Sequence, residues 1–212
     1  LQLFNLNLLY HEVLMMQQGI FVDGQLANTS DLNSEVLLEE ILENERGYVL
    51  IAEGAIANGP HGSGKYMVLG GKIYKDVFER AARNASVIVA IGQCATNSGV
   101  NAAESEISDL MDHRGVAFTL EDPSKGIVDL LGIDTPVVNI NGCPAHPDWV
   151  FLTIGAIALG KIRVPDDLPE VLDRWYRPKV FYPPDHTVHE NCPRRGFYDR
   201  GEFETTVGGP KC

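Results

Sequence analysis

Three short apolar runs, separated by stretches with helical spacing, constrain the fold of this chain more than any other feature. The runs are rich in β-branched residues and lack the alternation of a half-exposed strand, as expected of strands buried on both faces. They are GYVLIAEG (47–54), SVIVAIGQ (86–93) and TPVVNING (135–142). Because strands that alternate with helices form parallel sheets through crossover connections, the sequence predicts an α/β fold with a doubly wound parallel sheet.

Helical patterns lie between and around these runs. Apolar residues at helical spacing begin at Ser34, directly after a polar segment that can cap a helix. A short apolar stretch at 5–11 predicts one further strand. The other predicted helices cover 75–85, 100–114, 124–132 and 148–162.

The last quarter of the chain differs in composition from the rest. Residues 164–212 are rich in Pro, Gly, Asp and Arg and show little periodicity. Such a segment seldom builds its own core, so a partner or a metal centre should hold it. We therefore predict a domain over 1–163 and an irregular extension over 164–212.

Composition excludes several classes of partner. The chain has 17 Lys and Arg against 29 Asp and Glu, a net charge of −12, which opposes binding to nucleic acid or an anionic membrane surface. No run of 18 or more apolar residues occurs, so no transmembrane segment is expected. Because the chain starts at Leu1 and ends abruptly at Cys212, we expect it to be an interior section of a longer protein.

Two of the cysteines follow neighbouring predicted strands. Cys94 comes after the second run and Cys143 after the third, each beside a glycine, and Glu53 ends the first run. The carboxyl ends of parallel strands meet at one edge of a sheet, where such folds bind ligands. Two thiolates are too few for a zinc ion or an iron–sulfur cluster, so a cluster here needs further ligands. Inert buried thiols or a disulfide are the alternatives.

A second set of metal-binding residue types lies in the extension. His189 and Cys192 are spaced as His-x-x-Cys, and the terminal Cys212 can fold back as a third ligand. Arg194 and Arg195 place positive charge beside the thiolates, which offsets the charge of a cluster.

Other motifs are predicted to be structural. The segment GPHGSGKY (59–66) nearly matches a phosphate-binding loop, but Tyr66 replaces the magnesium-binding hydroxyl and Pro60 removes a backbone donor. Most histidines in proteins are not ligands. The histidines predicted to be structural or on the surface are His11, His61, His113 (near a helix end), His146 and His186.

In order and spacing, six segments resemble the small, electron-transferring subunit of [NiFe] hydrogenases. The last of them distinguishes this family from the related quinone-reductase subunit, which shares the G-x-C and G-C-P features but lacks such a tail. The segments are YHEVLM (10–15), EGAIANG (53–59), GQCATNSGV (92–100), NINGCPAHPDW (139–149), RPKVFY (177–182) and HENCPRRGFYDRGEF (189–203).

The resemblance implies a flavodoxin-like domain followed by an iron–sulfur cluster-binding extension. Cys94 and Cys143 would be two ligands of a proximal 4Fe-4S cluster, whose other two belong to a Cys-x-x-Cys upstream of Leu1. His189, Cys192 and Cys212 would bind a distal 4Fe-4S cluster. The ligands of a medial 3Fe-4S cluster lie outside this chain. Glu53, Arg194 and Arg195 would lie near the clusters without binding iron.

The resemblance also implies how the chain works. It would pass electrons from H2 oxidation, at the Ni–Fe centre of a large partner subunit, to an external carrier such as a cytochrome. No catalytic residue is expected in this chain, and the location would be periplasmic or membrane-associated.

This sequence departs from the family pattern at two positions near the proximal site. Asn97 replaces an aromatic residue, and Gly99 stands where oxygen-tolerant members carry an extra cysteine, so an ordinary four-iron cluster is expected. Two alternatives remain open. One is a complex I-like quinone-reductase subunit, and the other is a disulfide-stapled flavodoxin-like binding module without a redox metal.

Overall fold

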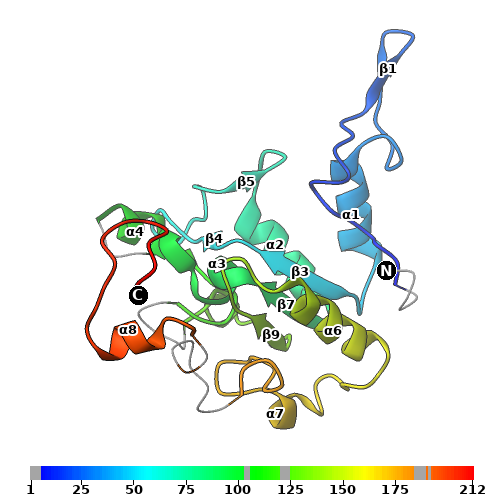
Figure 1. Ribbon diagram of the computed structural model, residues 1–212. Coiled ribbons are helices and arrows are strands. Elements are labelled where there is room, and N and C mark those ends of the chain that lie inside the picture. The colour runs from blue at the N-terminus through cyan, green and yellow to red at the C-terminus, as the bar shows by residue number, and fades with distance from the viewer. Residues whose placement is uncertain (1–5, 103–105, 120–124, 184–189, 191) are drawn as a thin grey trace. The chain divides into compact units, whose positions relative to one another are not determined.

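The structure is a computed structural model that describes residues 6–102, 106–119, 125–183, 190 and 192–212. It divides into two compact units, Leu1–Pro178 and Lys179–Cys212. Figure 1 shows the order of the elements along the chain.

The core of the first unit is a three-stranded parallel sheet, β3 (Val49–Glu53), β7 (Val87–Ile91) and β9 (Val137–Ile140), in the order β3-β7-β9. Glu53 lies opposite Ile91, and Ile91 lies opposite Ile140, so the three strands end level with one another. Each predicted buried run contains one of these strands. The predicted α/β class with a parallel sheet is confirmed.

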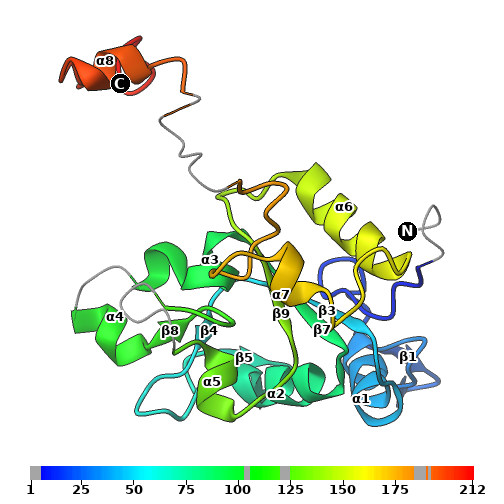
Figure 2. The ribbon, with the colours of Figure 1, turned by 90° about the horizontal axis from the view of Figure 1, so that it is seen from below.

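Helices cover both faces of this sheet. In Figure 2, α2 (Tyr74–Asn84) and α5 (Ile127–Leu131) lie below the strands and α6 (Pro147–Ala158) lies above them. Successive residues of β7 belong to different apolar clusters, because side chains alternate between the faces of a strand. One cluster joins Ile88 and Ala90 to Phe78, Ala82, Ile127 and Val128, and the other joins Val87 and Val138 to Leu168, Leu172 and Ile157.

The helix α1 (Ser34–Asn44) begins where the sequence predicts it. The side chain of Asn33 caps it by accepting hydrogen bonds from the backbone N–H groups of Glu35, at 2.8 Å, and Val36, at 3.4 Å. The predicted helix over 100–114 is interrupted, because a 3-10 turn at Gly99–Ala102 and α4 (Glu106–Met111) are followed by β8 (His113–Arg114).

The remaining described elements are short. They are β1 (Ile20–Val22), β2 (Gln25–Ala27), β4 (Ile56–Ala57), β5 (Val68–Leu69), β6 (Lys72–Ile73), α3 (Gly92–Asn97), α7 (Leu168–Val171) and α8 (Arg195–Asp199). The strand predicted at 5–11 is wrong for residues 6–11, which form no strand. The N–H groups of Leu14 and Met15 donate to the His11 carbonyl and make a turn there instead. Within the described part of the chain, no helix is long and apolar enough to cross a membrane.

Residues 164–178 pack on the first unit, although the predicted domain ends at residue 163. The backbone N–H of Asn139 in β9 donates to the Tyr176 carbonyl at 2.7 Å, and the Asn139 side chain donates to the Trp175 carbonyl at 2.9 Å. The Phe118 ring lies 5.6 Å from the Trp175 ring. The boundary between compact units therefore falls after Pro178, because the start of the extension covers the outer side of β9.

One carboxylate holds this segment in shape. Asp173 accepts from the backbone N–H groups of Trp175 and Arg177, both at 2.9 Å, and from the Arg177 guanidinium at 2.8 Å. Burial alone would raise the pKa of Asp173, but the hydrogen bonds from Arg177 and Trp175 together hold the pKa below its usual value.

Candidate metal centre

The carboxyl edge of the sheet brings two cysteine-bearing segments together. α3 follows β7 without a gap and carries Cys94, whereas Cys143 lies three residues beyond the end of β9. The backbone N–H of Gln93 donates to the Gly142 carbonyl at 2.8 Å. The residues that immediately precede the two cysteines are thus bonded to each other.

A group of polar side chains ties the same two segments a second time. The Asn141 side-chain amide nitrogen lies 2.7 Å from the Asn97 side-chain oxygen and 3.0 Å from the Thr96 hydroxyl. It also lies 3.3 Å from the side-chain oxygen of Gln93. We call Gln93, Thr96, Asn97 and Asn141 the amide clamp. The linking role of these residues is not predicted by the sequence patterns, although polar residues just beyond two buried strands are an indication of it.

Two glycines allow a close approach of the backbone beside the cysteines. Gly99 has a φ of +60°, and a Cβ added there would lie 2.8 Å from the Cys94 Sγ. Gly142 has a φ of +138°, and a Cβ there would lie 2.7 Å from the Pro144 carbonyl oxygen. The Gly99 backbone therefore lies close against the Cys94 segment, and any larger residue at 99 would crowd the Cys94 sulfur.

The donor set fits half of an iron–sulfur site. Cys94 is half-buried, Cys143 is exposed, and both are free thiols. Within the described residues, no group of three or more His, Cys, Asp or Glu side chains is arranged to hold a metal ion. Two thiols are half of the four ligands that an iron–sulfur cluster takes, so binding of a cluster by Cys94 and Cys143 stays a prediction.

Glu53 lies at the same edge. It is the last residue of β3, it is exposed, and it pairs with Ile91, which immediately precedes the glycine that begins α3. Its proximity to a bound cluster stays a prediction.

The second unit contains the cysteines of the extension. The backbone N–H of Arg195 donates to the Cys192 carbonyl at 3.0 Å, and the carbonyl of Cys212 accepts from the Glu204 N–H at 2.6 Å. Both thiols are free and half-buried. The Arg195 guanidinium lies 3.5 Å from the Asp199 carboxylate, which offsets part of its charge.

The predicted ligand His189 lies outside the described residues. The arrangement of His189, Cys192 and Cys212 around one cluster, with Arg194 and Arg195 beside it, therefore stays a prediction.

All four cysteines of the chain are free thiols in the structure. The alternative of a module stapled by two disulfides therefore has no bond to support it.

Two further histidines of the described part lie in regular elements or at their ends. His146 caps α6 by accepting from the Asp148 N–H at 3.3 Å, and its ring stacks on Trp149 with centroids 5.5 Å apart. His113 lies in β8, two residues after the end of α4, so it is near a helix end as predicted. Burial lowers the pKa of His113, and the nearby Asp112 carboxylate opposes part of that shift.

The side chain of Lys75 is bonded to the segment that resembles a phosphate-binding loop. Lys75 is buried, and its ammonium donates to the Asn58 side chain at 3.0 Å and to the Gly62 carbonyl. These hydrogen bonds from Lys75 stabilise the conformation of the loop.

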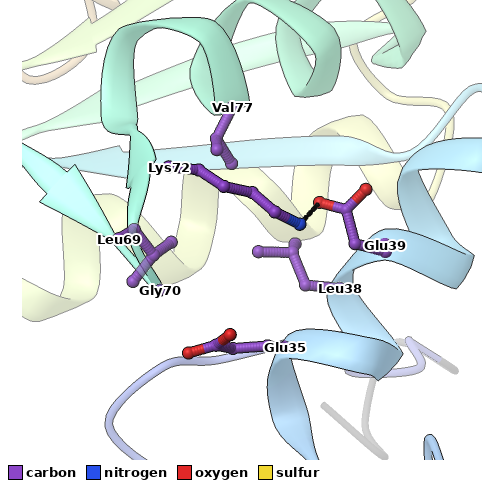
Figure 3. Close-up of a pocket in the computed structure, with 7 residues that line it drawn as sticks. All are labelled: Glu35, Leu38, Glu39, Leu69, Gly70, Lys72 and Val77. Carbon is purple, nitrogen blue, oxygen red and sulfur yellow. Dashed lines mark ion pairs between the residues drawn. The ribbon is translucent and has the colours of Figure 1, made fainter.

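A hollow between α1 and the β5–β6 hairpin is a packing junction. Its centre is an ion pair of 2.6 Å between Lys72 and Glu39, and Arg80 approaches the same carboxylate at 2.9 Å. The hydrogen bond from Lys72 lowers the pKa of Glu39. Figure 3 shows the lining residues, Glu35, Leu38, Glu39, Leu69, Gly70, Lys72 and Val77, none of which is a cysteine or histidine.

The sequence is similar to those of subunits of known oxidoreductases. The family profile described as "NADH ubiquinone oxidoreductase, 20 Kd subunit" matches residues 1–157. The "F420 non-reducing hydrogenase I small subunit" of Methanosarcina mazei is 62% identical over 208 residues, which are 98% of this chain and 54% of that protein. The "Periplasmic [NiFe] hydrogenase small subunit" of Solidesulfovibrio fructosivorans is 30% identical over 80% of this chain and 46% of that protein.

A solved structure agrees. The reduced, active Ni-Fe-Se hydrogenase from Desulfomicrobium baculatum matches with a TM-score of 0.64 and 29% identity, over 91% of this chain and 67% of that chain. The predicted resemblance to hydrogenase small subunits is confirmed. The chain spans about half the length of the curated relatives named above.

The extension distinguishes the two kinds of relative. The family profile ends at residue 157, whereas the alignment with the Methanosarcina mazei protein takes in 208 of the 212 residues. Most of the segment after residue 157 is therefore shared with a hydrogenase small subunit.

Proposed function

Because the chain belongs to the family described as the NADH ubiquinone oxidoreductase 20 Kd subunit, we propose that it is an iron–sulfur electron-transfer subunit, and specifically that of a [NiFe]-type hydrogenase. The observation that carries this proposal is the hydrogen bond between Gln93 and Gly142, which joins the segments bearing Cys94 and Cys143. Similarity to hydrogenase small subunits through the extension supports the specific assignment.

The residues of this chain have defined tasks in the proposal. Cys94 and Cys143 supply two thiolates, and Gly99 lets the backbone pass close to the first of them. A 4Fe-4S cluster held there would supply one-electron transfer to and from the Ni–Fe centre of a large partner subunit. In the extension, His189, Cys192 and Cys212 would hold a distal 4Fe-4S cluster, and a medial 3Fe-4S cluster would take its ligands from other residues.

The acceptor and location are further parts of the proposal. The relative from Methanosarcina mazei is named as F420 non-reducing, which supports an acceptor other than F420, such as a cytochrome. A periplasmic or membrane-associated location is supported by the name of the Solidesulfovibrio fructosivorans relative.

Metal analysis of the purified native complex tests the proposal. We expect iron and acid-labile sulfide in this subunit, nickel in its partner, and reduction of a dye by H2. Iron and sulfide without nickel would favour the second candidate, a quinone-reductase subunit, which the family name supports. A complex without iron would refute both.

A separate experiment tests the distal site. Replacing His189 with Ala should slow electron delivery from H2 to an external dye far more than it slows hydrogen isotope exchange, because exchange needs no electron exit. His61→Ala provides a matched control, since His61 is an exposed histidine of the first unit. Equal losses in both assays for His189→Ala would contradict the assignment.

A further inference from the structure

We propose that Asn97 and Asn141, together with Thr96, are positioning residues that fix the separation of Cys94 and Cys143 and raise the reduction potential of the cluster bound by these cysteines. This inference rests on the proposed function and goes beyond it, because these residues would act through the cysteines and would not bind iron.

The positions of the clamp residues explain how they fix the cysteines. Asn97 follows Cys94 by three residues in the same short helix, and Asn141 precedes Cys143 by two residues. Their side chains meet at 2.7 Å, whereas the backbone bond from Gln93 to the Gly142 carbonyl is 2.8 Å long. Two links that use different atoms resist both separation and rotation of the segments, which a single link cannot do.

Burial makes these bonds effective. Thr96 is fully buried, with 0% of its surface exposed, and Asn97 and Asn141 are half-buried. A hydrogen bond shielded from water is electrostatically stronger than one at the surface, and partners in a shared network reinforce one another. The cysteine segments should therefore keep their spacing when the charge on a bound cluster changes.

Polarity explains the expected effect on the potential. Reduction adds negative charge to a cluster that thiolates already make negative, and polar surroundings stabilise this more highly charged state better than aliphatic ones. Groups outside the ligand set tune a metal site by orienting its ligands and by setting the local dielectric. Replacing the amides with aliphatic side chains should therefore lower the reduction potential.

The test is a redox titration of the native complex, monitored by electron paramagnetic resonance of the inner cluster. Asn97→Leu removes the acceptor for Asn141 with little change in volume. Thr96→Val replaces a hydroxyl with a methyl group at a buried site. Asn44→Leu is the matched control, because Asn44 is exposed at the end of α1.

We expect a lower midpoint potential for Asn97→Leu, a smaller shift in the same direction for Thr96→Val, and none for Asn44→Leu. In the double variant of Asn97→Leu with Asn141→Leu, the shift should be smaller than the sum of the single shifts, because the two residues share one bond. Loss of iron from Asn97→Leu but not from Asn44→Leu would also support positioning, provided that Thr96→Val retains iron and shifts the potential.

An unchanged potential at full iron content in Asn97→Leu would overturn the inference and leave the proposed function intact. If Asn97→Leu does not assemble, Thr96→Val decides the question by the same criterion. A wild-type complex without iron would instead refute the proposed function itself.

Discussion

Replacing Gly99 with Ala tests how tightly the backbone surrounds the Cys94 sulfur. The substitution has two costs. A left-handed conformation is unfavourable for a residue with a Cβ by about 1–2 kcal/mol. The new Cβ would also lie 2.8 Å from the Cys94 Sγ, and overpacking of this kind costs about 1–3 kcal/mol. The expected loss of unfolding free energy is therefore about 2–5 kcal/mol.

Gly132 supplies a control that separates these costs. Its φ of +58° nearly equals the +60° of Gly99, but a Cβ added at Gly132 meets nothing within 4 Å. Gly132→Ala should therefore lose only the backbone part, about 1–2 kcal/mol. Urea denaturation of the full-length protein, compared with both variants at one temperature, gives the two differences. Equal losses in the two variants would refute the argument, because they would show that Cys94 moves aside freely.

Three further predictions concern the fold and its pH dependence. Ile88→Ala, at a fully buried site in the central strand, should destabilise the protein by about 2–5 kcal/mol, measured by urea denaturation. Ile51→Ala should cost clearly less, because Ile51 is 49% exposed, and equal losses would contradict the assignment of the core. Asp173→Asn should lose about 1–3 kcal/mol at pH 7 by weakening charge-assisted bonds to Arg177. Folding lowers the pKa of Asp173, so its contribution to stability is fully present above the unfolded pKa of about 3.9. This contribution is lost as pH falls through the folded pKa. The melting temperatures of wild type and Asp173→Asn should therefore converge below about pH 4.

Most of the first unit could be predicted from its sequence because buried parallel strands have a distinctive composition. The three apolar runs and the capped helix at Ser34 formed as expected, since both signals depend on residues close together in the chain. The strand expected at 5–11 did not form over residues 6–11, because an apolar run forms a strand only where a neighbour pairs with it.

The place of residues 164–178 could not be read from sequence periodicity. Their contact with β9 uses the carbonyl groups of Trp175 and Tyr176, and every residue type has a carbonyl. The amide clamp escaped detection for a related reason, because Asn97 and Asn141 are distant in the chain and belong to no common motif. By contrast, topology alone indicated that Cys94 and Cys143 follow neighbouring strands at one edge.

The contact between Asn139 and Tyr176 has a practical consequence for handling this protein. An exposed edge strand offers unpaired backbone groups to any other extended chain, which promotes self-association. A polypeptide shortened to end at residue 163 would uncover that side of β9 and should precipitate during expression. A polypeptide ending after Pro178 keeps the segment that covers β9 and prevents its pairing with another chain. Residue 178 is therefore the better end point for a shortened polypeptide.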